Sequence, residues 1–198
     1  MGYSLPASPD WKPMTTILAV QHEDKVMFGA DSQTTATTGK RYTHPSMTKL
    51  TEKNQYIIAC AGDVSACDIV HHLWTPPNPK TADWDDLYVF VVSKVVPSLK
   101  LCFKDNEYKW QNEKDDEGGF TILLAVGGIV FEIDDDMSVS LDQGGLYGIG
   151  SGSDLGIGAL ASGASLRKAL GIAAKFDVYT AAPFIFKTQV KRVLNHKK

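Results

Sequence analysis

The sequence contains few cysteines and no long apolar segment. Its only cysteines among 198 residues are Cys60, Cys67 and Cys102, and no two of them form a C-x-x-C pair. A sparse, odd set of thiols is typical of buried, reduced cysteines in a cytosolic protein and not of a disulfide framework. No run of about 18 apolar residues is present, which argues against a simple transmembrane helix. We therefore expect a cytoplasmic protein with no membrane partner.

The chain also lacks a strong charge of either sign. It carries 20 Lys and Arg against 23 Asp and Glu, a formal net charge of −3. Nucleic acids and anionic membranes favour a basic face, so this balance gives no support for either as a partner. The 43% of hydrophobic and 22% of charged residues are ordinary for a soluble globular protein. A chain of this length can bury a sizeable core as one domain without a metal ion or a disulfide.

The familiar cofactor and metal motifs are missing as well. The sequence has no G-x-x-x-x-G-K-[ST], no G-x-S-x-G and no H-E-x-x-H segment. It therefore gives no support for a P-loop protein, an α/β-hydrolase or a zinc protease. The glycine-rich turn at 148–152 lacks the context of a dinucleotide site, and the three aspartates at 134–136 lack the spacing of a calcium loop. His71 and His72 are adjacent, so they cannot chelate one ion as an i, i+4 pair would. These patterns predict no metal.

Blocks of strands alternate with pairs of helices along the chain. Apolar runs and turn residues predict strands over 15–20, 25–30, 49–50, 56–61, 120–126, 129–133, 137–141, 146–149 and part of 183–194. Helical spacing predicts helices over 62–74, 83–99, 154–162 and 165–176. Paired helices do not suit a doubly wound parallel sheet. The order instead predicts an α+β fold, a four-layer αββα sandwich in which helix pairs cover two antiparallel sheets.

The helices carry finer predictions. Asp83 is the expected N-cap of the second helix, and Pro97 is expected to kink or end it. The charged stretch 105–118 indicates an exposed loop or hairpin. The side chains expected to be buried share one face of the helix over 62–74: Val64, Ala66 or Cys67, Val70 and Leu73.

Residues 1–14 differ from the rest of the chain. They contain three prolines and little periodicity, so we expect a loose leader followed by one domain over 15–198. Met14 precedes a small threonine, and methionine aminopeptidase removes methionine from such positions. Two interpretations remain open: a propeptide cleaved at the Met14–Thr15 bond, or an upstream extension with Met14 as the true initiator.

Segments spread over residues 15 to about 185 resemble one known family. They are Thr15–Ile17, Ala30–Thr35, Met47–Leu50, Ala61–Gly62, Ile149–Ser153 and Asp177–Thr180. In this order and spacing they resemble the N-terminal-nucleophile threonine peptidases of the proteasome β-subunit and HslV type. Asp63 stands where that family usually has a second small residue, and Met14 stands where its self-processing members carry glycine. The resemblance implies the N-terminal-nucleophile (Ntn) hydrolase fold.

The resemblance also implies a catalytic set. Thr15 would supply the nucleophilic hydroxyl and, as the first residue, a basic α-amine that titrates near neutral pH. Lys49 would lower the pKa of that amine, Asp31 would hold Lys49, and the Gly62 N–H would face the oxyanion. The other positions carried over are the supporting residues Ser151, Asp177 and Thr180 and the specificity-pocket residues Thr34, Thr35, Cys60 and Val64. No cofactor is expected, apart from a structural monovalent or divalent cation near Asp177.

The function implied is that of a threonine endopeptidase subunit, active once Thr15 is exposed. Such subunits form stacked homo-oligomeric rings, and an AAA+ ATPase unfoldase would feed them unfolded protein or peptides. The alternative is a catalytically silent, structural or assembly subunit of the same fold. A leader retained on Thr15 would favour that alternative, because it blocks the α-amine as a peptide.

Overall fold

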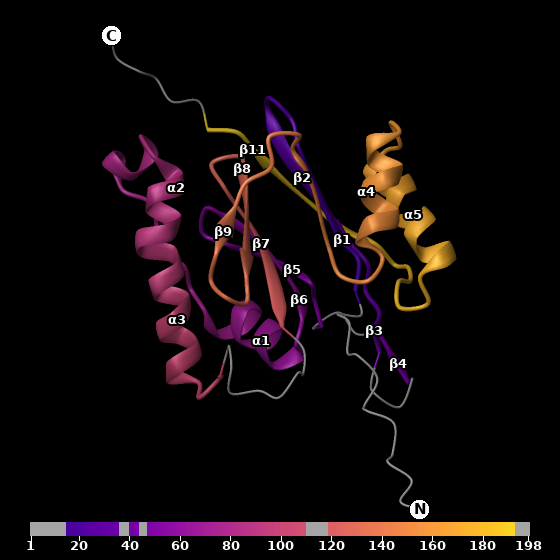
Figure 1. The fold of residues 1–198 in the computed structure, drawn as a ribbon, viewed down its shortest axis with the longest axis horizontal. Helices are drawn as coiled ribbons and strands as arrows, with labels where there is room; N and C mark the ends of the chain where they lie inside the picture. The colour runs from indigo at the N-terminus through magenta and orange to yellow at the C-terminus, as the bar shows by residue number, and fades with distance from the viewer. Residues whose placement is uncertain (1–14, 36–39, 44–46, 110–118, 193–198) are drawn as a thin grey trace, which may run out of the picture.

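The computed structural model describes residues 15–35, 40–43, 47–109 and 119–192. The predicted leader and residues 110–118 of the charged stretch lie outside the described residues. The described chain forms two antiparallel sheets with helices on their outer faces (Figure 1).

The two sheets differ in how their strands follow one another along the chain: the second joins strands that are neighbours in the sequence, whereas the first places two strands from late in the chain on either side of its N-terminal hairpin. The first has the order β10–β1–β2–β11: β1 (Ile17–Gln21), β2 (Lys25–Ala30), β10 (Leu146–Ile149) and β11 (Ile185–Val190). The second has the order β5–β6–β7–β8–β9: β5 (Leu50–Lys53), β6 (Tyr56–Gly62), β7 (Phe120–Val126), β8 (Ile129–Asp134) and β9 (Val139–Ser140). A separate two-residue ladder joins β3 (Thr34–Thr35) to β4 (Arg41–Tyr42).

The helices come in two groups. The first group is α1 (Val64–Asp68), the π-helix η1 (Ile69–Leu73), the 3₁₀-helix η2 (Thr81–Trp84), α2 (Leu87–Phe90), the π-helix η3 (Val91–Val95) and α3 (Val96–Asp105). The second group is α4 (Ser153–Ala161) and α5 (Leu166–Phe176). Within the described residues, no helix is both long enough and apolar enough to cross a lipid bilayer.

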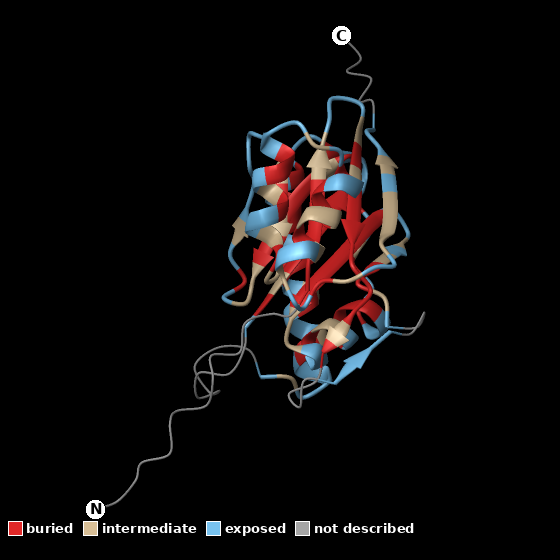
Figure 2. Ribbon diagram, turned by 90° about the vertical axis from the view of Figure 1, so that its right-hand side faces the viewer, coloured by how far each residue is buried: buried red, intermediate tan, exposed pale blue. Residues whose placement is uncertain are grey.

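Three apolar layers hold the sheets and helices together. The first packs the five-stranded sheet against the first helix group and includes Trp74, Phe90 and Phe103. The second lies between the two sheets, and the third lies under α4 and α5. Figure 2 shows the buried residues concentrated in the strands and on the inner sides of the helices. The arrangement confirms the predicted four-layer αββα sandwich.

Strand β6 shows how the sequence produces these layers. Successive side chains of a strand point to opposite faces, so Ile57, Ala59 and Ala61 enter the layer between the sheets. Tyr56, Ile58 and Cys60 enter the layer beneath the helices. A continuous apolar run is therefore required here, because both faces of the strand are covered.

The first helix differs from its prediction. Gly62 ends β6, and the helix begins at Val64, where the Asp63 carboxylate caps it by accepting from the amides of Ser65 (2.7 Å) and Ala66 (3.2 Å). Val64 and Leu73, both expected to be buried, are 54% and 57% exposed. The π-helical turn at 69–73 has more residues per turn than an α-helix. This turn follows Val64, so it bears on Leu73 alone. Ala66 and Val70 are buried as predicted, together with Ile69 and Trp74.

The second helix also differs from its prediction. Its N-cap is Asp86, whose Oδ1 accepts from the Val89 amide at 3.0 Å. Asp83 lies in η2 and accepts from the Lys80 amide instead. Pro97 does not end the helix, because it lies in the first turn of α3, directly after the π-helical segment η3. Proline is tolerated in a first helical turn, where its missing N–H matters least.

Candidate active site

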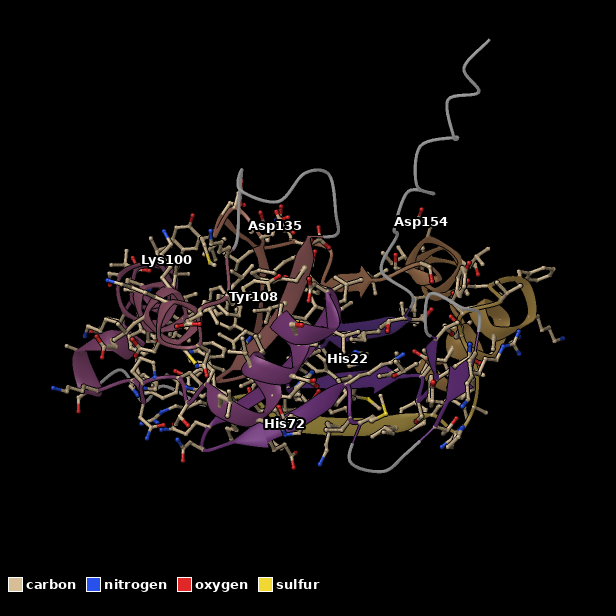
Figure 3. All side chains as sticks on the ribbon, turned by 90° about the horizontal axis from the view of Figure 1, so that it is seen from below. His22, His72, Lys100, Tyr108, Asp135 and Asp154 are labelled. Carbon is tan, nitrogen blue, oxygen red and sulfur yellow. The ribbon has the colours of Figure 1, made fainter. Side chains whose placement is uncertain are left out.

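Strand ends from both sheets meet at one end of the sandwich. Ile17 pairs with both Ala30 and Ile149, so residues 15–16, 31–33 and 150–152 leave the four-stranded sheet at the same edge. Leu50 pairs with Ala59 in the other sheet, which brings the start of β5 close to the end of β6. Figure 3 views the molecule from this end, with α1 in front. Most of the predicted site residues lie at these strand ends, whereas Val64 begins α1, and Asp177 and Thr180 lie between α5 and β11.

A buried ion pair forms one side of the site. The Nζ atom of Lys49 donates to Oδ1 of Asp31 at 2.6 Å and to the Gln33 carbonyl at 2.6 Å. Asp31 is fully buried and Lys49 is 7% exposed. The second carboxylate oxygen of Asp31 accepts from the Gln33 amide at 3.0 Å. Asp31 is therefore fixed by backbone and side chain together, as a buried charge requires.

The environment of Lys49 shifts its pKa. Burial lowers the pKa of Lys49 below its ordinary value of 10.5, and the Asp31 carboxylate acts in the opposite direction. Asp177 also favours the charged form of this lysine. A lysine with a lowered pKa releases a proton more readily than an exposed lysine does.

A hydroxyl–carboxylate network forms the other side of the site. Oδ2 of Asp177 accepts from the hydroxyls of Ser151 (2.8 Å) and Thr180 (2.5 Å). Oδ1 of Asp177 accepts from the Tyr179 amide at 3.2 Å. The structure therefore brings the three predicted supporting residues into direct contact.

Thr15 lies beside the hydroxyl–carboxylate network, and the amide of the next residue, Thr16, donates to Asp31. It is 7% exposed, and its carbonyl oxygen faces the Ser151 hydroxyl at 3.4 Å and the Gly152 amide at 3.5 Å. Gly150 has a φ of +92°, and a Cβ there would lie 2.1 Å from the Thr15 carbonyl oxygen. Glycine is thus required at 150 for the loop to approach Thr15 so closely. Strand β1 starts at Ile17, two residues later than predicted, so Thr15 lies just outside the strand.

Gly62 is placed by β6 and by its neighbour strand. Its φ is +116°, and a Cβ would meet the Gly119 carbonyl oxygen at 2.3 Å and the Phe120 Cα at 2.7 Å. No other residue fits this conformation at this distance. The role of the Gly62 N–H toward an oxyanion stays a prediction.

The four predicted pocket residues lie in different surroundings. Thr35 is buried and accepts from the Gln33 side-chain amide at 2.9 Å, while Thr34 is half-buried. Cys60 faces the apolar layer beneath the helices, where burial raises the pKa of its thiol, and Val64 is exposed. That these residues share one substrate pocket stays a prediction.

A surface groove of about 490 Å³ lies at the other end of the sandwich. It is lined by the β5–β6 turn, by Gly127, by the end of β11 and by Arg192 beyond it, whose guanidinium lies 4.0 Å from the centre of the Trp84 ring. Tyr56 lines this groove, whereas Gly62 marks the opposite end of the same strand. The groove is therefore separate from Thr15.

The sequence prediction missed three residues that complete the site. Thr16 contacts both networks, Gln33 joins Lys49 to the Val178 carbonyl (3.2 Å from its Nε2), and Gly152 packs against Thr16. Gln33 and Gly152 lie inside segments that carried the resemblance, so position within those segments was a usable signal. Thr16 lies inside such a segment as well, Thr15–Ile17, but the sequence gives it no role apart from that of its neighbour Thr15.

The four layers and the strand ends that meet at Thr15 define the fold of the Ntn hydrolases. No protein-family model and no curated protein matches the chain. Solved structures do match: BPH of Thiobacillus denitrificans in complex with epoxomicin has a TM-score of 0.68 at 18% identity, covering 89% of this chain and 98% of that one. Eukaryotic HslV from Trypanosoma brucei has a TM-score of 0.59 at 20% identity, covering 89% and 99%. Anbu, described as an ancestral beta-subunit, from Yersinia bercovieri has a TM-score of 0.65 at 12% identity, covering 89% and 81%. At these identities the likeness shows the fold.

Proposed function

We propose that this chain is a threonine-type endopeptidase subunit whose nucleophile is Thr15. The observation that carries the proposal is the shared carboxylate oxygen of Asp31. It accepts from the Lys49 ammonium at 2.6 Å and from the Thr16 amide at 2.9 Å. A buried cation is thereby tied to the peptide that follows Thr15. A cation at this place favours loss of the Thr15 hydroxyl proton.

The reaction begins with attack of the Thr15 hydroxyl oxygen on the carbonyl carbon of a peptide bond. The hydroxyl proton passes to the free α-amine of Thr15, and the negative charge on the tetrahedral intermediate is stabilised by the Gly62 N–H. Collapse of the intermediate breaks the C–N bond, and the α-ammonium returns the proton to the leaving amine. Water then hydrolyses the acyl-enzyme and restores Thr15. Every step needs the α-amine, so Thr15 must first be released from Met14.

The silent subunit remains the second candidate. As long as Met14 is bonded to Thr15, the Thr15 nitrogen is a peptide nitrogen and cannot act as a base. The neighbour described as an ancestral beta-subunit is compatible with either function.

We also propose a ring-forming assembly in the cytoplasm, fed by an AAA+ unfoldase. The assembly is supported by an apolar surface around Asp177, where Phe176, Val178 and Tyr179 are 72%, 62% and 36% exposed; the cytoplasm and the unfoldase rest on the resemblance alone. Adjacent exposed apolar side chains are typical of surfaces that a partner covers. A structural cation near Asp177 stays a prediction. Both oxygens of that carboxylate accept hydrogen bonds from the protein, and a cation would have to share them.

The experiment compares a chain that starts at Met1 with one that starts at Met14. We expect the second to lose Met14, to cleave a fluorogenic peptide and to add one epoxomicin at Thr15, located by intact mass and peptide mapping. Thr15→Ala should abolish both reactions without loss of the fold, and Thr15→Ser should keep part of the activity. Equal turnover by wild type and Thr15→Ala would refute the assignment. A chain with a free Thr15 and no turnover would favour the silent subunit.

A further inference from the structure

The amide and the hydroxyl of Thr16 are committed to two different carboxylate networks. Its amide donates to Oδ1 of Asp31 at 2.9 Å, and its hydroxyl lies 2.5 Å from the Thr180 hydroxyl. Thr16 is fully buried, so it cannot contact a substrate. Because Asp31 holds Lys49 and Thr180 binds Asp177, Thr16 is the residue through which the two networks meet.

The direction of the Thr16–Thr180 hydrogen bond follows from counting protons. A threonine hydroxyl has one hydrogen to donate, and a carboxylate oxygen can only accept. Thr180 donates its hydrogen to Oδ2 of Asp177 at 2.5 Å. The hydrogen bond between the two threonines must therefore be donated by Thr16. The chain of donors runs from Thr16 through Thr180 to Asp177.

The Thr16 hydroxyl is enclosed by the loop at 150–152. A Cβ at Gly152 would lie 2.1 Å from the Thr16 hydroxyl oxygen and 2.9 Å from Oδ2 of Asp177. Thr180 is only 3% exposed, so water has little access to the group that Thr16 serves. Loss of the Thr16 hydroxyl would leave the Thr180 oxygen without this donor in a buried position, which is the costly case for a hydrogen bond.

We propose that Thr16 is a positioning residue for the nucleophile, an inference that rests on the proposed function. Its amide is held on the Lys49 side and its hydroxyl on the Asp177 side, so the peptide between Thr15 and Thr16 has one orientation. That orientation sets where the Thr15 hydroxyl and α-amine point. Catalytic groups lose much of their rate when their orientation relaxes.

The kinetic test uses the chain that starts at Met14, with Thr16→Val and Thr16→Ser. Valine keeps the shape of threonine without the hydroxyl, and serine keeps the hydroxyl. We expect Thr16→Val to lower kcat by about 10- to 100-fold, the effect of losing one hydrogen bond in a charged network. KM should stay within about twofold, since Thr16 touches no substrate, and Thr16→Ser should recover most of kcat. Wild-type kcat in Thr16→Val, or a KM effect as large as the kcat effect, would overturn the proposal.

A second measurement needs no activity and separates this inference from the proposed function. We expect the losses in Tm from Thr16→Val and Thr180→Val to be strongly non-additive, because each removes the same hydrogen bond. Additive losses would overturn the positioning role even in an active enzyme. If Thr15→Ala kept full turnover, the proposed function would fail, and the catalytic positioning role would fail with it. Non-additive Tm losses would still establish the contact between Thr16 and Thr180.

Discussion

His71 makes the stability of this protein sensitive to mild acid. The side chain is 4% exposed, its Nδ1 lies 3.1 Å from the Thr51 hydroxyl, and its buried Nε2 has no hydrogen-bond partner among the described residues. Burial lowers the pKa of His71 from its ordinary 6.5 to about 4, and the charges of His72 and Lys53 act in the same direction. The folded protein therefore resists protonation of this ring.

The sign of the pH effect follows from that shift. The unfolded chain takes up the proton near pH 6.5 and the folded chain only near pH 4. The contribution of neutral His71 to the free energy of unfolding is therefore present above pH 6.5 and is lost as the pH falls toward 4. The whole effect is worth roughly 3 kcal/mol, and about 2 kcal/mol of it falls between pH 6.5 and 5. Most carboxylates do not titrate in that upper window, which makes it the diagnostic range.

The assay is urea unfolding at fixed protein concentration, from pH 7 to pH 5, followed by tryptophan fluorescence. His71→Gln removes the titrating group, so its free energy of unfolding should change by less than about 1 kcal/mol over this range. His72→Gln is the matched control at the exposed neighbour labelled in Figure 3, and it should keep the wild-type slope. Parallel slopes for wild type and His71→Gln would show that the acid sensitivity lies elsewhere.

Three further predictions test the site and its assembly. Lys49→Ala and Asp31→Asn should each lower peptidase kcat by several orders of magnitude. Lys49→Arg should rescue little, because a guanidinium cannot replace a compact ammonium. Steady-state kinetics checks this, and mild effects from all three substitutions would place the active site elsewhere. Gly152→Ala should lower both Tm and kcat, since its Cβ would lie 2.1 Å from the Thr16 hydroxyl oxygen, while Gly158→Ala, with nothing within 4 Å, should raise Tm slightly. Light scattering should find an oligomer that Phe176→Asp weakens, and a stable monomer at micromolar concentration would contradict the ring.

The sandwich was predictable because its local signals agree with one another. Strand β6 is apolar on both faces, and the Gly127–Gly128 turn, with φ of +63° and +81°, joins β7 to β8 as its sequence indicates. The helix ends near 153 and 176 fall within a residue of prediction, helped by the Ser165 cap. Such agreement between pattern, turn and cap is what makes a fold recoverable from one sequence.

The parts that could not be predicted have identifiable physical causes. Periodicity at 3.6 residues per turn cannot detect the π-helical turns at 69–73 and 91–95, and these turns decide which side chains are buried. The contact of Thr16 with Thr180 joins residues 164 positions apart, and a buried threonine in a strand pattern indicates only core. The main site residues were found through resemblance, whereas Thr16 needed the three-dimensional contact.

Asp63 shows why a departure from the family pattern need not disable the site. Its carboxylate accepts from the amides of Ser65 and Ala66 and so starts α1 directly after Gly62. An alanine at this position could not cap the helix with its side chain, and losing such a cap to alanine costs about 1 kcal/mol. Only Gly62 has the positive φ at this turn, so the second position is free of the need for glycine. The aspartate therefore fits the conformation that the turn requires, and it stabilises the helix that follows the proposed oxyanion donor.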